Sequence, residues 1–193
     1  GTPGASGLGS GLGRRLERLL LPYRCRSLPD IAAAVAIAPG YDIDESPRTC
    51  EQPYNSLMTW RIQSFFVRRN HDLLKDKAGF DEAVRARTLP SLIRHSYGMA
   101  GYRSEADYMR DMDPKGALPH IRTPLLCINA ISDPLAVAGG LKSVEPVFEA
   151  SRHLVLAVTR TGSHLPFYEG LLRGRSWTER VSVEFISSCL SMT

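Results

Sequence analysis

The sequence predicts an α/β domain in which a mostly parallel sheet is flanked by helices. Three short apolar runs, each closed by turn-forming residues, are typical of buried parallel strands and cover residues 31–38, 124–130 and 153–158. Helical patterns separate these runs, and strands that alternate with helices form parallel sheets. A chain of 193 residues is long enough to bury one sizeable core and too short for two ordinary domains.

The elements follow in chain order. A Gly-rich stretch over residues 4–13 leads into a helix over 14–21, which Pro22 ends. After the first strand, a helical insertion is predicted over about 53–103. Such an insertion can cover a site as a lid, or it can be plain helical packing, and the sequence leaves both open. A helix around 144–150 then separates the second strand from the third.

Two apolar clusters are expected in the core. In the insertion, Trp60, Phe65 and Phe66 form an aromatic group, and aromatic side chains are more often core residues than the lining of a lipid pocket. In the last helix, over about 177–190, helical spacing places three apolar residues on one face. They are Val181, Phe185 and Cys189.

Charge and composition exclude several classes of protein. The net charge of +4 is a mild excess without a recognisable nucleic-acid-binding module, so no nucleic-acid partner is expected. One basic cluster stands near the start of the chain. It comprises Arg14, Arg15, Arg18, Arg24 and Arg26. We interpret that cluster as the solvated face of a helix. A peripheral contact with anionic lipid headgroups is the alternative interpretation.

No metal, cofactor, disulfide or membrane span is predicted. The four cysteines lie far apart, without Cys-x-x-Cys pairs or histidines at ligand spacing. No apolar stretch approaches the roughly 20 residues that cross a bilayer, and no signal peptide is visible. We therefore expect a cytoplasmic or membrane-associated protein. Because the first residue is Gly1, we expect the natural start to lie upstream.

Two residues after strand ends can carry chemistry. Asp133 follows the second strand and His164 follows the third, and the carboxyl ends of parallel strands meet at one edge of a sheet. A carboxylate that orients a histidine, which in turn activates a hydroxyl, is the arrangement of a hydrolytic triad. Taken alone, each residue is explained as well by a structural role in a loop or at the surface as by a catalytic one. Taken together, their positions favour the interpretation that Asp133 is the acid and His164 the base of a catalytic pair.

Several motifs resemble the YheT-like branch of the α/β-hydrolases, and the resemblance runs from about Ile31 to Leu190. The matching segments are 51–57, 80–81, 86–88, 97–108, 121–126, 132–134, 161–164 and 167–170. The resemblance implies the C-terminal part of an α/β-hydrolase fold, with Asp133 and His164 at the positions of the family's acid and base. It implies hydrolysis of acylglycerol, phospholipid or other acyl esters without a cofactor, or acyl transfer to an alcohol. The chain departs from the family where Ser163 and Ser132 replace a glycine and an acidic residue.

The sequence leaves three interpretations of the nucleophile open. Ser6 has the first Gly of a Gly-x-Ser-x-Gly elbow, at Gly4, but Leu8 stands where the second is required. Ser10 has leucine at both required glycine positions, although its distance to the first strand fits better. A Gly-rich terminus without an elbow is the third interpretation. Helix phase favours Ser6, which is the residue we assign.

The sequence as a whole predicts a serine hydrolase of carboxylesterase or lipase type. Its triad would be Ser6, Asp133 and His164, and its partner an acyl-ester or lipid substrate. The rival is a non-catalytic α/β-hydrolase-like binding or scaffold protein that has lost its nucleophile. Strands that precede the elbow in such folds are missing from the sequence, so residues 1–193 are expected to form a partial domain and to be a poor catalyst alone.

Overall fold

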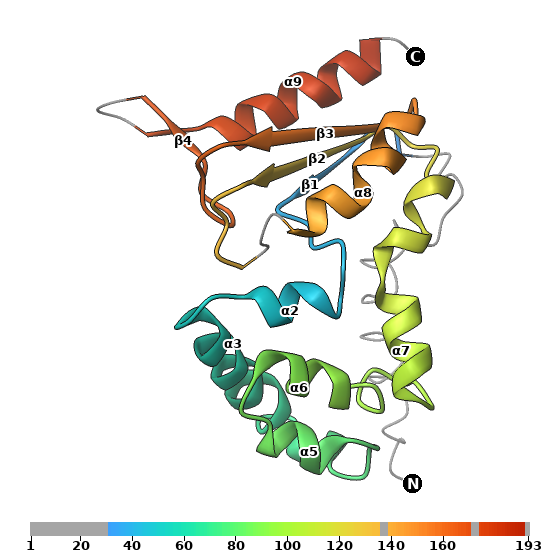
Figure 1. Cartoon of the computed structure of the whole chain (residues 1–193), viewed down its shortest axis with the longest axis vertical. Helices are drawn as coiled ribbons and strands as arrows, with labels where there is room; N and C mark the ends of the chain where they lie inside the picture. Colours follow the sequence, from blue (N-terminus) through green and yellow to red (C-terminus); the bar gives the residue numbers. More distant parts are fainter. Residues whose placement is uncertain (1–30, 136–138, 171–173, 192–193) are drawn as a thin grey trace, which may run out of the picture.

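A computed structural model of the chain describes residues 31–135, 139–170 and 174–191. The Gly-rich stretch, the helix expected over 14–21 and both candidate nucleophiles, Ser6 and Ser10, lie outside the described residues. The basic cluster near the start lies outside them as well. Figure 1 shows a sheet with its helices in one part of the molecule and a group of short helices in the other.

The three predicted apolar runs form one parallel sheet. Its strands are β1 (Ala34–Ile37), β2 (Leu125–Ala130) and β3 (Leu154–Thr159), in the order β1-β2-β3. Ala34 is paired with Leu125, and Leu125 with Leu154, so the strands start in step and end at the same edge. The α/β fold with a parallel sheet and flanking helices is therefore confirmed.

Helices cover both faces of the sheet (Figure 1). On one face, α8 (Gly139–Ala150) packs Val144 and Phe148 into a cluster that includes Cys127 of β2. On the other, α9 (Trp177–Ser191) packs Phe185 against a cluster that includes Ile128. Successive residues of a strand point to opposite faces, so a strand covered on both sides must be apolar throughout. This explains the unbroken apolar run that predicts β2.

The last helix matches its predicted pattern. Val181 and Phe185 pack on the sheet, and Cys189 is buried on the same helix. Before α9, a short antiparallel hairpin joins β4 (Tyr168–Glu169) to β5 (Arg175–Ser176), which the sequence did not predict. Among the described residues, no helix has the length and apolar character that crossing a bilayer requires.

The segment between β1 and β2 is helical, and α2 to α6 lie apart from the sheet (Figure 1). It consists of α2 (Glu45–Thr49), α3 (Tyr54–Ile62), the π-helical η2 (Gln63–Val67), α4 (His71–Leu74), α5 (Phe80–Arg85), α6 (Leu89–His95), α7 (Glu105–Met112) and the 3₁₀ turns η3 (Pro114–Gly116) and η4 (Leu118–His120). A hydrophobic cluster within this segment contains Val67, Leu74, Phe80, Ala83 and Leu92. We call the segment from Glu51 to the end of α6 the helical insertion.

The expectation that the aromatic group of the insertion is core is wrong. Trp60, Phe65 and Phe66 are about half exposed, at 53%, 55% and 48%. The helix instead turns polar side chains inward, and those of Asn55 and Gln63 are buried. Helical periodicity separates two faces, and here hydrogen bonding decides which of them faces the protein.

Candidate active site

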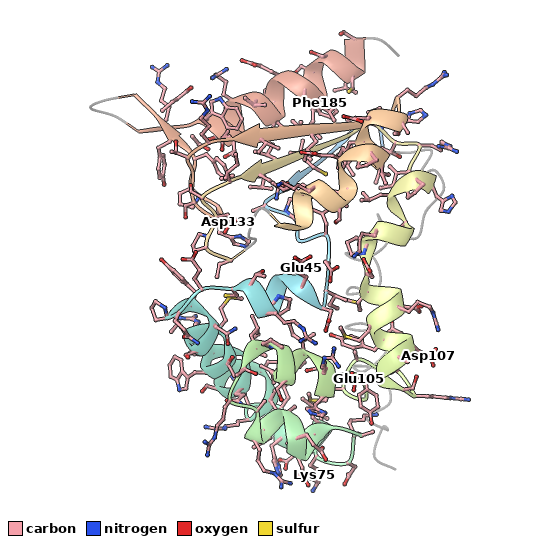
Figure 2. All side chains as sticks on the ribbon, viewed as in Figure 1. Glu45, Lys75, Glu105, Asp107, Asp133 and Phe185 are labelled. Carbon is pink, nitrogen blue, oxygen red and sulfur yellow. The ribbon has the colours of Figure 1, made fainter. Side chains whose placement is uncertain are left out.

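The acid candidate lies in the loop that follows β2. Asp133 is only 2% exposed, and its backbone N–H donates to the carbonyl of Ala130 at 3.3 Å, which folds the loop into a turn. The Leu135 N–H donates to Oδ1 at 2.8 Å. Figure 2 shows Asp133 on the side of the sheet that faces the helical insertion. A buried carboxylate needs such donors, because removing it from water is costly.

The base candidate comes from the loop that follows β3. His164 Nδ1 lies 2.9 Å from Oδ2 of Asp133, although 31 positions separate the two residues. A carboxylate accepts hydrogen bonds, so Nδ1 carries the proton and Nε2 is left as the acceptor. The His164 side chain is 34% exposed, so its ring is accessible. The structure therefore brings the predicted acid and base into direct contact.

Ser132 joins the two loops. Its hydroxyl donates to the Gly162 carbonyl at 3.0 Å and accepts from the Gly162 N–H at 3.2 Å. Gly162 stands two positions before His164, and Ser132 stands next to Asp133. These two bonds set the distance between the acid loop and the base loop. The sequence drew attention to Ser132 only as a departure from a family pattern, because a single loop serine carries no signal of a partner 30 residues away.

A glycine is required where the base loop passes over the sheet. A Cβ at Gly162 would lie 2.7 Å from the Phe167 ring and 3.0 Å from the Ala130 Cβ. Phe167 itself is buried and stacks near Trp177, with ring centroids 6.2 Å apart. The loop that carries His164 thus rests directly on the core, and this close packing holds the imidazole in place.

The helical insertion contacts the acid loop at its first turn. The Glu51 N–H donates to the Pro134 carbonyl at 3.1 Å. Next to it, Cys50 is buried, and burial raises the pKa of its thiol, with a further contribution from the negative charge of Asp133. A raised pKa keeps the thiol protonated at neutral pH, so Cys50 is a poor nucleophile. Burial also raises the pKa of Cys127 to about 11.

A buried polar pair holds the ends of β1 and β2 together. The Tyr41 hydroxyl donates to Oδ1 of Asn129 at 2.9 Å, and the Asn129 side-chain amide donates to the Pro39 carbonyl at 3.1 Å. Asn129 is the last residue but one of β2, four positions before Asp133. Both the oxygen and the nitrogen of the Asn129 amide have hydrogen-bond partners in the segment after β1, so these bonds hold that segment beside the acid loop.

The site is chemically an acid–base pair. An imidazole held by a buried carboxylate can take a proton from a hydroxyl and return it to a leaving group. The described residues contain no group of three or more His, Cys, Asp or Glu side chains arranged to hold a metal ion. Ser6, the assigned nucleophile, lies outside the described part of the chain, so its position relative to His164 stays a prediction.

Comparisons with known proteins show what the chain is similar to. No protein-family model matches the chain. Mouse phospholipase ABHD3 is 26% identical over 197 residues, which cover 96% of this chain and 46% of the relative. The zebrafish monoacylglycerol lipase ABHD2 is 23% identical over 82% of this chain and 41% of the relative. A solved monoacylglycerol lipase of Paleococcus ferrophilus is 15% identical, with a TM-score of 0.40 over 94% of this chain and 65% of that one.

These two curated relatives are ABHD-type α/β-hydrolases, one named as a phospholipase and the other as a monoacylglycerol lipase. The chain spans less than half the length of these relatives. The coarse prediction of an α/β-hydrolase of esterase or lipase type agrees with these names. The narrower assignments, to the YheT-like branch and to a particular triad, are proposals.

Proposed function

We propose that this chain carries the acid and base of a serine hydrolase that cleaves acyl esters of lipids, with Ser6 as the nucleophile. The observation that carries the proposal is the contact between His164 Nδ1 and the buried Asp133 carboxylate. Lipid substrates are proposed because the relatives are named as phospholipases and monoacylglycerol lipases. Membership of the YheT-like branch is part of the proposal and rests on the motifs of the sequence.

The proposed reaction has two acyl-transfer steps. The Ser6 oxygen attacks the ester carbonyl carbon while His164 Nε2 takes the hydroxyl proton. The tetrahedral intermediate collapses to an acyl-serine, and the leaving alcohol takes that proton from His164. Water then attacks the acyl-serine with His164 as base, which releases the carboxylic acid and restores the serine. The Asp133 carboxylate stabilises the imidazolium that forms in each step. An alcohol in place of water gives acyl transfer.

A fluorophosphonate probe tests the proposal, because it labels only an activated serine. In the natural protein that contains these residues, we expect labelling that His164→Ala abolishes. Asp133→Asn should slow labelling by about 10⁴-fold, as loss of the orienting carboxylate does in serine proteases. His153→Ala is the matched control, since His153 stands at the amino end of β3, and it should label as the wild type does.

The same experiment identifies the nucleophile. Mass spectrometry of the labelled peptide should find the probe on Ser6, and Ser6→Ala should prevent labelling while Ser10→Ala leaves it intact. A probe on Ser10 would overturn the Ser6 assignment. Absence of both labelling and ester hydrolysis in the wild type would overturn the hydrolase proposal and favour the non-catalytic rival.

A further inference from the structure

One surface of the helical insertion is apolar where a solvent-facing helix is usually polar. It is formed by side chains of α3 and η2 that are between 42% and 55% exposed, and we call it the outer apolar face. Its members are Tyr54, Leu57, Trp60, Phe65 and Phe66. The Trp60 and Phe65 rings meet edge to face with centroids 6.2 Å apart, so these two side chains form a continuous surface. Contiguous exposed apolar patches mark interaction sites.

The inner face of the same segment carries buried polar side chains that are hydrogen-bonded, beside apolar ones such as Val67. The Gln63 side-chain amide donates to the carbonyls of Ala83, Val84 and Ala86 at 2.7 to 3.0 Å, at the end of α5. Asn55 donates to the Pro47 carbonyl and accepts from the Leu89 N–H. These buried bonds would be lost if the segment rotated, so the aromatic side chains are held outward by the fold.

The charge around the outer apolar face points to its occupant. Residues 52–71 contain three arginines and no aspartate or glutamate. The arginines are Arg61, Arg68 and Arg69. The Arg61 guanidinium lies 5.0 Å from the centroid of the Phe65 ring, so positive charge borders the aromatic side chains directly. Tryptophan and tyrosine prefer the headgroup level of a bilayer, and arginines attract anionic lipids.

We propose that the outer apolar face docks on an anionic lipid surface, with its aromatic side chains at the headgroup level and its arginines against the lipid phosphates. Segments that lie in a membrane interface combine these features: large apolar side chains on one side and bordering basic residues. The Glu51 N–H, three residues before Tyr54, donates to the Pro134 carbonyl, so the acid loop is bonded to the start of the segment that carries this face. The docking requires neither Ser6 nor His164, so its test is independent of catalysis.

Trp60 reports docking directly, because the chain has only two tryptophans. In a Trp177→Phe variant, Trp60 is the sole tryptophan. Adding vesicles of phosphatidylcholine and phosphatidylserine should shift its emission to shorter wavelengths, and brominated phosphatidylcholine in those vesicles should quench it. Pure phosphatidylcholine vesicles should bind more weakly. No emission shift and no quenching with the anionic vesicles would overturn the proposal.

Vesicle co-sedimentation of the protein with both tryptophans intact provides the second measurement. Each change of Arg61, Arg68 or Arg69 to Gln should weaken binding roughly fivefold. The double change Phe65→Ser and Phe66→Ser should weaken it at least about tenfold. Val183→Ser is the matched control: Val183 is an apolar residue of α9 that is 59% exposed, and its loss should leave binding unchanged.

Two further outcomes count against a lipid surface. If the double phenylalanine variant sediments with vesicles as the wild type does, the outer apolar face is not the docking site. If light scattering finds a dimer whose Trp60 emission is already shifted before vesicles are added, a second copy of the chain covers the face. A monomer whose Trp60 emission shifts only on adding anionic vesicles supports the proposal.

Discussion

At the scale of single residues, the candidate site depends on how two loops are held, because an acid and a base act together only at hydrogen-bond distance. Asp133 and His164 meet at 2.9 Å, and Ser132 ties their loops through two bonds with Gly162. The Ser132 hydroxyl makes these bonds with the Gly162 backbone, whereas the imidazole Nδ1 contacts Asp133. Ser132 is therefore a positioning residue, and its effect should differ from that of the acid and the base.

Ser132→Ala should reduce the rate of fluorophosphonate labelling without abolishing it. The change removes two exposed hydrogen bonds, so we expect a loss of stability of about 1 kcal/mol and a kcat that falls about tenfold with little change in KM. Ser143→Ala removes a comparable exposed bond in α8, to the Gly140 carbonyl, and should leave kcat unchanged. A Ser132→Ala enzyme with wild-type kcat would show that the two bonds do not position His164.

Gly162 tests the packing beneath the base loop. Gly162→Ala places a methyl group 2.7 Å from the Phe167 ring, and we expect a loss of about 1–3 kcal/mol in the free energy of unfolding. Gly116→Ala is the control, since a Cβ at Gly116 meets nothing within 4 Å. Chemical denaturation measures the free energy of unfolding of both variants. A smaller side chain, as in Phe167→Leu, should relieve part of the loss, and no relief would place the clash elsewhere.

At the scale of secondary-structure elements, charges connect α2 to its neighbours. Asp42 accepts from the N–H groups of Asp44 and Glu45 at the start of α2 and pairs with Lys115 of η3. Asp44 pairs with Arg94 of α6, which also pairs with Glu105 of α7. Burial raises the pKa of Asp42, but the bonds from Lys115 and from the two N–H groups outweigh it and lower the pKa.

These pairs predict how stability depends on pH. A carboxyl group whose folded-state pKa is lowered contributes stability that is complete above its unfolded value, about 3.9, and is lost as pH falls through the folded value. Asp42→Asn should therefore cost about 1 kcal/mol around pH 7, after allowance for solvent screening, and almost nothing near pH 2. Urea denaturation at several pH values measures this cost. Asp76→Asn, at an exposed position of the insertion, is the matched control for the loss of one carboxylate.

At the scale of the whole molecule, the insertion and the sheet have separate hydrophobic clusters. The cluster of the insertion contains Val67 and Leu92, whereas β2 contributes Cys127 to one sheet cluster and Ile128 to the other. Polar contacts join the two parts, among them the bond from Glu51 to the Pro134 carbonyl. Cooperative units of a protein coincide with such clusters, because each loses its burial as a whole.

Hydrogen exchange should therefore resolve two cooperative units. Leu92→Ala and Ile128→Ala both truncate an almost fully buried side chain, and each should cost about 2–5 kcal/mol. We expect Leu92→Ala to lower the protection of amides in α5 and α6 while β2 and β3 keep theirs, and Ile128→Ala to lower that of the strands. Equal losses in both parts after Leu92→Ala would show that the domain opens as one unit.

The parts of the fold that follow from local pattern were predictable. The apolar run over 124–130 predicts β2, because a strand covered on both faces needs no polar positions. The approach of Asp133 to His164 was predictable too, since parallel strands that start in step bring their following loops to one edge. The hairpin of β4 and β5 was not, because two-residue strands leave no periodicity in a sequence.

The sequence by itself determined the α/β alternation, the two faces of α9 and the order of the acid and base, because these depend on spacing along the chain. Only the tertiary structure decided that Trp60, Phe65 and Phe66 face outward. Periodicity shows that a helix has two faces. Which of them faces inward is decided by partners farther along the chain: Ala83 lies 20 positions from Gln63, and Leu89 lies 34 positions from Asn55. The tertiary structure also decided the role of Ser132, whose bonds to Gly162 exist only because the strands lie side by side.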